Sequence, residues 1–391
     1  MIRVGFLLNY NPKTWLGGFN VKKNLINSFK QLNQKKIEAF IIAPNSFKKD
    51  YKNFKISRNR IIFTDFFENQ SSLFKLFNKL LIIFFGKSYI YDDFFKSINV
   101  KVVSHGLNFG LGLKSAIKSI SWIPDFQHVY YPEYFSYRVR ILKYINTLFS
   151  AISSTKIILS SNDVKKDLQN ILPFKYNKII VHPYIIDLPI KKKIISLNKL
   201  IKKYDIKKNY FYIPNQFWKH KNHDIVVESL RYAKKIDKEI TIVLTGFPYD
   251  HRHKDHFGEL NKKIKKYNLL KNYIYLGVIP YIDVMSLMYH CVAIINPSKF
   301  EGCSSSVEQS KSMGKKVILS NIEIHKEQNP PRRHYFNPNN HKQLTKILVK
   351  TLENYNRKQD IKFISGAYNC INLRLKKYAS EYQKHIVKIF K

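Results

Sequence analysis

The strongest constraint on the fold is a segment in the last third of the chain, residues 291–320, which predicts a strand, a loop, a helix and a second strand in succession. The apolar run 291–295 is typical of a buried parallel strand, and 315–320 has the pattern of the next strand. Between them, 307–313 has helical character and stops at Gly314, a common residue at helix C-termini. The segment therefore indicates an α/β domain.

The N-terminus of this expected helix is suited to an anion, because its first N–H groups have no partner within the helix and the helix dipole is positive there. Hydroxyls for an N-cap come from Ser304, Ser305 and Ser306. Glu301, before the helix, and Gln309, within it, could bind hydroxyls of a polyhydroxylated ligand. A phosphate beside a sugar suggests a nucleotide sugar. The alternative from these residues alone is an ordinary capped helix.

The amino-terminal part begins with a similar arrangement. Residues 2–8 read as a strand, Gly17 and Gly18 as a glycine turn, and 21–32 as a helix. In a Rossmann-like unit such glycines let the backbone approach a phosphate. The sequence is not GxGxxG, so a dinucleotide site is not indicated, and a plain tight turn is the alternative.

A polar and aromatic cluster follows a short strand near residue 121. Asp125 and His128 belong to it, and open α/β sheets place their sites at the carboxyl ends of strands. These two side chains could orient sugar hydroxyls or move a proton, which predicts a catalytic role. The alternative is that they hold a loop together.

The strand and helix pattern restarts after residues 188–209, which we interpret as an interdomain linker. The chain's 391 residues suffice for two domains. Gln216 and Lys221 follow the first strand of the second half. Later strands end near Gly246 and Val278, both in turns.

The chain is strongly basic, with 68 Lys and Arg against 27 Asp and Glu and a net charge of +41. The lysines are spread along the whole length, whereas nucleic-acid binders concentrate them on one element, so nucleic acid is not the expected partner. An anionic membrane surface is a natural partner for such charge. The segment 73–85 fits an amphipathic helix at a membrane. It also fits a half-buried surface helix.

Three cysteines without metal-binding spacing indicate a reducing compartment. The start of the chain lacks the pattern of a signal peptide, and the longest apolar run, 80–85, is too short to cross a bilayer. No Asp-x-Asp pair lies near a strand end. We therefore expect a cytoplasmic protein that is peripheral on the inner face of the membrane, with no metal and no cofactor.

The segment from Glu301 to Gly314 resembles the donor-site signature of retaining glycosyltransferases with the GT-B fold, of the group-1/family-4 type. That signature has a Glu, seven residues, a second Glu, and a Gly shortly after. Glu301 and Gly314 match, but Gln309 holds the second Glu position and Glu308 lies one residue early. Adjacent residues on a helix point about 100° apart. Glu308 is therefore not expected to take the place of the second Glu of the signature. The resemblance implies that this position binds the ribose, where Gln lacks charge assistance.

The same resemblance implies a cation pair for the diphosphate. Lys221 fits the Lys of that pair. The Arg is absent, with Asn215 or Gln216 in its place, and either Lys219 or His220 supplies the missing cation or the site is weaker.

Other positions gain expected roles from the resemblance. Gly17 and Gly18 would face the diphosphate and sugar, and Gly246 and Val278 would lie where the nucleobase rests against backbone. The segment 122–128 resembles a subset of bacterial glycosyltransferases for surface polysaccharide, such as O-antigen or capsule.

The sequence thus predicts a GT-B fold with two Rossmann-like domains. They span 1–195, joined by a C-terminal helix at 372–391 that crosses back, and 205–371. The expected function is retaining, metal-independent hexosyl transfer from a nucleotide diphosphate sugar to a lipid-linked saccharide or glycan in surface polysaccharide (such as lipopolysaccharide) biosynthesis. Asp125, His128 and Glu301 are the candidate catalytic residues. Two alternatives remain: a silent GT-B scaffold that binds a glycan or partner protein, and a sugar-phosphate epimerase.

Overall fold

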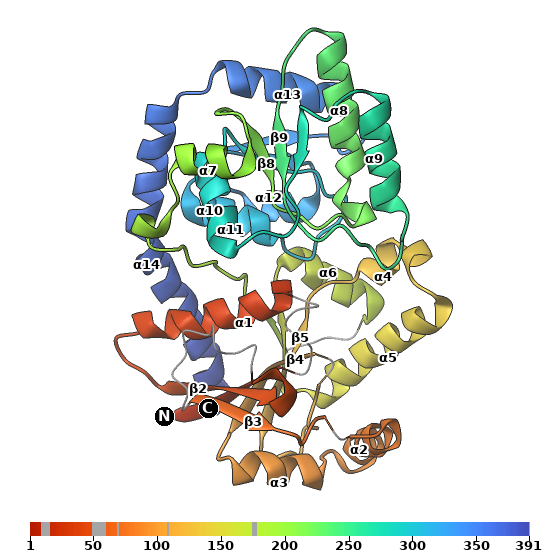
Figure 1. Ribbon diagram of the computed structural model, residues 1–391. Helices are drawn as coiled ribbons and strands as arrows, with labels where there is room; N and C mark the ends of the chain where they lie inside the picture. Colours follow the sequence, from red (N-terminus) through yellow and green to blue (C-terminus); the bar gives the residue numbers. More distant parts are fainter. Residues whose placement is uncertain (9–15, 49–59, 69, 108, 174–177, 391) are drawn as a thin grey trace. The chain divides into compact units, whose positions relative to one another are not determined.

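The computed structural model describes the chain except residues 9–15, 49–59, 69, 108, 174–177 and 391. It contains two compact units (Figure 1). The first comprises residues 1–185 and 372–391, and the second comprises 186–371. Each unit is a parallel sheet with helices packed around it.

The first unit has a seven-stranded sheet with the order β3-β2-β1-β4-β5-β6-β7, and its pairings are all parallel. The strands are β1 (Ile2–Leu7), β2 (Ile37–Pro44), β3 (Ile61–Thr64), β4 (Val102–Leu107), β5 (Lys118–Ile123), β6 (Lys156–Leu159) and β7 (Ile179–Val181). The helices are α1 (Leu16–Ser28), α2 (Ser72–Phe85), α3 (Tyr89–Ser97), α4 (Gln127–Tyr130), α5 (Tyr137–Ser153) and α6 (Asn162–Ile171).

The second unit has a six-stranded parallel sheet with the order β10-β9-β8-β11-β12-β13. The strands are β8 (Phe211–Ile213), β9 (Ile242–Leu244), β10 (Tyr273–Tyr275), β11 (Ile294–Asn296), β12 (Val317–Ser320) and β13 (Arg333–Phe336). The helices are α7 (Leu197–Tyr204), α8 (His223–Lys235), α9 (His256–Lys266), α10 (Tyr281–His290), α11 (Ser305–Met313), α12 (Glu323–Gln328) and α13 (His341–Glu353). A last helix, α14 (Arg357–Lys388), begins in this unit and ends in the first.

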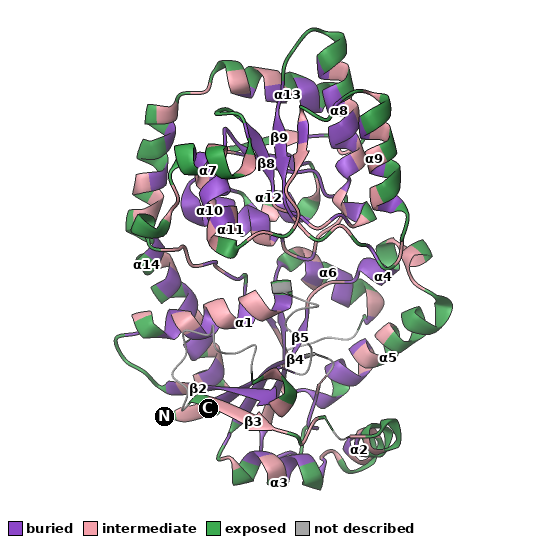
Figure 2. Cartoon of the chain, viewed as in Figure 1, coloured by how far each residue is buried: buried purple, intermediate pink, exposed green. Residues whose placement is uncertain are grey.

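The four central strands of the second unit, β8, β9, β11 and β12, are buried on both faces, as expected where helices cover both sides of a parallel sheet. Side chains alternate across a strand. Phe211 and Ile213 therefore enter one buried cluster, while Tyr212 between them enters the cluster on the other face. Figure 2 shows these strands buried and the outer faces of the surrounding helices exposed. The sequence prediction of two Rossmann-like α/β sheets with a C-terminal helix is confirmed.

In both sheets the strand order reverses once, between β1 and β4 and between β8 and β11. The loops that follow two such strands leave the same edge of the sheet in opposite directions, which opens a crevice at the carboxyl ends. In the second unit these loops are 214–222, after β8, and 297–304, after β11. The topology therefore brings together two segments that are about 80 residues apart in the sequence.

The predicted glycine turn at Gly17 and Gly18 is wrong, because α1 already begins at Leu16. Glycine weakens a helix by only about 1 kcal/mol, and the burial of Val21 and Leu25 in α1 outweighs that loss. The two glycines thus lie in the first helical turn. The last helix also begins earlier than the predicted 372–391, at Arg357.

Candidate functional site

The centre of the candidate site in the second unit is an ion pair between Lys221 and Glu301. Lys221 ends a short 3-10 turn, Lys219–Lys221, after β8, and Glu301 lies in the loop after β11. Their Nζ and Oε1 atoms are 2.6 Å apart, and the side chains are 14% and 8% exposed. The reversal of strand order between β8 and β11 is what places these two residues in contact.

Glu301 is ionised in spite of its burial. Burial alone raises the pKa of its carboxyl group, but the charge and hydrogen bond of Lys221 lower it further, so the pKa is below its usual value. Ser298 Oγ also donates to Oε1, at 2.7 Å. The pair is therefore a largely buried cation beside a largely buried, ionised carboxylate.

Asn296, which the sequence analysis did not single out, organises this loop. It is fully buried at the end of β11, and its Nδ2 donates to Ser304 Oγ at 2.7 Å and Ser306 Oγ at 3.1 Å. Its Oδ1 accepts from Ser298 N at 3.1 Å and from Asn215 Nδ2 at 3.4 Å. The only sequence signal was the Asn-Pro-Ser turn pattern at 296–298. One amide thus connects the loops after β8 and β11 and the start of α11.

The expected helix after this loop is confirmed as α11, with Ser304 at its N-cap position and Gly314 at its C-cap with φ 71°. A Cβ at Gly314 would lie 2.8 Å from Phe363 O, so only glycine fits there. The expected capping hydroxyl is not seen, because Ser304 Oγ is used by Asn296 and makes no cap hydrogen bond.

The side chain of Gln328, the last residue of α12, makes hydrogen bonds to the start of α11. Gln328 Oε1 accepts from Ser304 N at 3.1 Å, and its Nε2 donates to Ser304 O at 2.9 Å. Ser304 and Ser306 are buried, and Ser305 is partly exposed. Of the three serines expected to meet a ligand, Ser305 is therefore the one with an exposed surface.

Glu308 and Gln309 point in different directions from α11. Glu308 is 4% exposed, and its Oε1 accepts from Gln328 Nε2 at 3.2 Å. Gln309 is partly exposed, and the Tyr281 hydroxyl shares a hydrogen bond with it. Because Glu308 is committed to the interior, Gln309 is the residue of the two that a ligand can reach.

Gly246 and Val278 lie in the loops after β9 and β10. Gly246 has φ 149°, and a Cβ there would lie 2.3 Å from Asn215 O, so glycine is required for the close approach of two loops. Its N–H donates to Gly277 O at 3.0 Å. Val278 is 72% exposed, and Gln216, next to Asn215, is partly exposed. These loops present main chain at the carboxyl edge of the sheet.

The two proposed substitutes for the missing arginine differ in their surroundings. Burial lowers the pKa of His220 well below its usual value, with Lys221 and Arg252 adding to the fall. His220 is therefore neutral near pH 7 and does not supply the cation. Lys219 is exposed. Lys219 remains the candidate of the two.

His325, on α12, lies fully buried close to the ion pair. Its Nδ1 lies 2.9 Å from Ser320 O, which requires the Nδ1–H tautomer and leaves Nε2 as an acceptor. Burial lowers its pKa to about 4, although Glu301 opposes the fall. His325 therefore presents a neutral imidazole to Glu301 and Lys221.

The remaining predicted residues belong to the first unit. Asp125 Oδ1 accepts from Gln127 N at 3.0 Å, so Asp125 braces the start of α4. His128, on α4, is 8% exposed, and its buried Nδ1 makes no hydrogen bond in the described part of the chain. Gly17 is exposed and Gly18 is buried at the start of α1.

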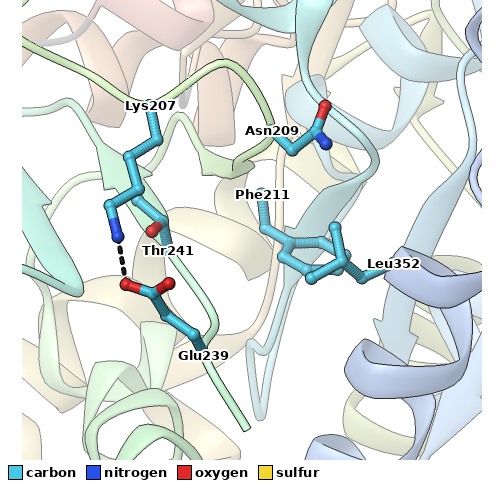
Figure 3. Close-up of a pocket in the computed structure, with 6 residues that line it drawn as sticks. All are labelled: Lys207, Asn209, Phe211, Glu239, Thr241 and Leu352. Carbon is cyan, nitrogen blue, oxygen red and sulfur yellow. Dashed lines mark hydrogen bonds and ion pairs between the residues drawn. The ribbon is translucent and has the colours of Figure 1, made fainter.

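A cavity of about 280 Å³ in the second unit does not belong to this site. Figure 3 shows it lined by side chains that include Phe211, Thr241 and the ion pair of Lys207 with Glu239. Phe211 begins β8 and Thr241 precedes β9, so the cavity lies at the amino-terminal edge of the sheet. The candidate site lies at the carboxyl edge. No cluster of potential metal ligands occurs among the described residues.

The two parallel sheets and the shared last helix define the class of GT-B proteins, and solved structures confirm that fold. The chain resembles HepE of Anabaena, solved with UDP and glucose (TM-score 0.71, 13% identity, 99% of this chain and 100% of that one). It also resembles a glycosyltransferase of Rickettsia africae (TM-score 0.66, 18% identity, 99% of each chain). A third is WaaG, a glycosyltransferase involved in lipopolysaccharide biosynthesis (TM-score 0.64, 11% identity, 98% and 99%). No curated protein sequence matches the chain.

Residues 198–368 match the family described as glycosyl transferases group 1. This range covers nearly all of the second unit, including Lys221, Glu301 and α11. The second unit is therefore similar in sequence to group 1 glycosyltransferase domains.

Proposed function

We propose that the protein is a retaining glycosyltransferase that moves a hexose from a nucleotide diphosphate sugar to a glycan or lipid-linked saccharide of a surface polysaccharide. The observation that carries this proposal is the Lys221–Glu301 pair beside the N-terminus of α11. It combines a cation and helix N–H groups, which suit a diphosphate, with a carboxylate, which suits sugar hydroxyls.

In this proposal the bond between the anomeric carbon and the diphosphate breaks, and the diphosphate leaves with the electron pair. Lys221 and the start of α11 stabilise its negative charge, so that neither a metal nor a cofactor is needed. The acceptor hydroxyl attacks from the same face and its proton passes to a base. His128 is the candidate in the first unit for handling that proton. Glu301 holds hydroxyls of the donor sugar.

The contact between Lys221 and Glu301 has a consequence for donor binding. Lys221 Nζ already contacts Glu301 at 2.6 Å. A diphosphate that reaches Lys221 must share this cation or replace Glu301 as its partner. In the second case Glu301 becomes available to the sugar at the moment the diphosphate binds.

The second candidate is a catalytically silent scaffold of the same fold that binds a glycan or a partner protein. The missing arginine, the neutral His220 and Gln309 in place of a carboxylate favour it. A third candidate, a sugar-phosphate epimerase, has no specific observation in its favour.

The experiment that separates these candidates measures nucleoside diphosphate release. A thermal-shift screen of nucleotide sugars first identifies the donor, which is then incubated with and without a panel of glycan acceptors. A transferase gives release that depends on the acceptor, and the anomeric configuration of the product tests retention. Release that is independent of the acceptor indicates hydrolysis or epimerisation, and binding without release indicates a scaffold.

The orientation of Gln309 gives a prediction about nucleotide affinity. Gln309→Glu is expected to tighten binding of the nucleoside diphosphate about fivefold. A charge-assisted hydrogen bond to ribose is stronger than a neutral one by roughly 1 kcal/mol. Repulsion by the diphosphate opposes this gain, but the ribose is the nearer group. Calorimetry with the free nucleoside diphosphate measures the difference.

Glu308→Gln serves as the matched variant. Because Glu308 is buried against Gln328, this change is expected to leave affinity within about twofold of the wild type. A loss of affinity in both variants would instead assign the ribose to Glu308.

A further inference from the structure

Helix α2 turns most of its apolar residues away from the protein. Only Asn78 and Ile82 of its 14 residues are buried. Its exposed apolar side chains, which are between 42% and 78% exposed, are Leu73, Leu76, Phe77, Leu80, Ile83, Phe84 and Phe85. A surface helix of a globular domain normally shows the opposite pattern, with apolar residues inward. The expectation of a half-buried helix is therefore not met.

Helix α5 continues this surface. Lys79 of α2 donates from Nζ to Asn146 Oδ1 of α5 at 2.9 Å and lies 5.2 Å from the ring centroid of Phe149. The first half of α5 is exposed around most of its circumference (Figure 2). Its exposed apolar residues include Tyr137, Val139, Ile141, Leu142, Tyr144 and Ile145. We call these residues and those of α2 the α2–α5 face.

The charges on the α2–α5 face have one sign. Neither α2 nor α5 contains an aspartate or glutamate. Five cations accompany the apolar side chains on these helices, namely Lys75, Lys79, Arg138, Arg140 and Lys143. If two copies of the chain packed together through this face, the cations of both copies would meet, and neither helix offers a carboxylate to pair with them. The charges therefore disfavour a second copy as the partner. Apolar side chains among cations suit a surface that is negatively charged outside and apolar beneath.

We propose that the α2–α5 face binds the surface of an anionic lipid bilayer. Helix α2, about 21 Å long from its 14 residues, lies in the plane of the interface with Phe77 and Phe84 in the acyl boundary. The cations of α2 and α5 contact the headgroups. No helix in the described part of the chain is long and apolar enough to span a bilayer, so binding is to the surface. The proposal does not depend on the transfer reaction.

Sedimentation of the full-length protein with vesicles tests it. The protein is expected to pellet with vesicles of phosphatidylcholine and phosphatidylglycerol and to bind much less to phosphatidylcholine alone. Rising salt should weaken binding, because the headgroup attraction is screened within a Debye length. Equal binding to both vesicle types, or none to the anionic ones, would overturn the proposal.

Variants separate this face from the general positive charge of the chain. Phe77→Ser with Phe84→Ser is expected to raise the dissociation constant roughly thirtyfold, since two aromatic side chains leave the acyl boundary. Lys75→Gln with Arg138→Gln should raise it by about tenfold or more.

Controls come from the second unit. Leu270→Ser removes an apolar side chain that is 60% exposed, and Lys265→Gln with Lys266→Gln removes two exposed cations of α9. Both should bind vesicles within about twofold of the wild type. If Lys265→Gln with Lys266→Gln lowers the affinity for vesicles as much as Lys75→Gln with Arg138→Gln does, binding is general charge attraction and the proposal fails. It also fails if the wild type is a dimer that does not bind vesicles and the Phe77 and Phe84 variant is a monomer in ultracentrifugation.

Discussion

Lys221→Met is expected to lower the free energy of unfolding by about 3 kcal/mol, because it leaves the buried carboxylate of Glu301 without its cation. The two side chains are 14% and 8% exposed, so solvent compensates little for the lost partner. Denaturant unfolding of the wild type and the variant, fitted with the same m-value, measures the change in the free energy of unfolding. The double variant Lys221→Met with Glu301→Gln is expected to recover part of the loss, since the unpaired charge is then removed.

The matched control for this experiment is Lys207→Met. Lys207 pairs with Glu239 on the surface, where the side chains are 48% and 70% exposed. Exposed ion pairs contribute about 0–1 kcal/mol, so little change is expected. Equal losses in Lys221→Met and Lys207→Met would contradict the buried-pair interpretation. Because the pKa of Glu301 is below its usual value, the contribution of the pair is present above the ordinary carboxyl pKa and is lost only as the pH falls through the lowered value.

His128→Ala is expected to lower the turnover number about 100-fold or more while the protein stays folded, if the imidazole acts on a proton or a forming charge. Burial lowers the pKa of His128 to about 4, Lys143 adds to the fall and Asp125 opposes it. The ring is therefore neutral throughout the pH range 5.5–8. Single-turnover rates with a saturating donor measure the effect.

Two further measurements distinguish catalysis from packing. His385→Ala, on α14 of the same unit, replaces a partly exposed histidine outside the candidate site and should leave turnover within about threefold. Because His128 is neutral between pH 5.5 and 8, its protonation should not change the rate in this range. The pH–rate profiles of the wild type and of His128→Gln should therefore have the same shape between these pH values. Activity of His128→Ala within about threefold of wild type would make His128 a structural residue.

The sequence predicted the elements whose signals are local. The buried strand before Glu301, the helix α11 and its glycine stop at Gly314 each follow from patterns within about ten residues. The start of α1 was missed because its position does not follow from local signals. Local chemistry at Gly17 and Gly18 favours a turn, and the burial of Val21 and Leu25, which outweighs it, depends on the assembled sheet.

The arrangement of the candidate site depended on contacts that no local pattern records. Lys221 and Glu301 meet because β8 and β11 are neighbours, which is a property of the strand order. Whether Glu308 or Gln309 faces outward depends on the position of Gln328, 20 residues beyond Glu308. The periodicity of α2 allowed two interpretations, a membrane-surface helix and a half-buried surface helix. Periodicity shows that a helix has an apolar side but not whether that side points inward or outward.

The position of Asn296 also affects how long the site stays intact. Asparagine side chains age by deamidation when the backbone nitrogen of the next residue attacks the amide and closes a five-membered ring. The next residue here is Pro297, which has no N–H and cannot close that ring in the usual way. The amide is also fully buried and held at both ends by Ser304 and Ser298. The residue that ties the candidate site together is thus protected against the commonest spontaneous chemical damage of its side-chain type.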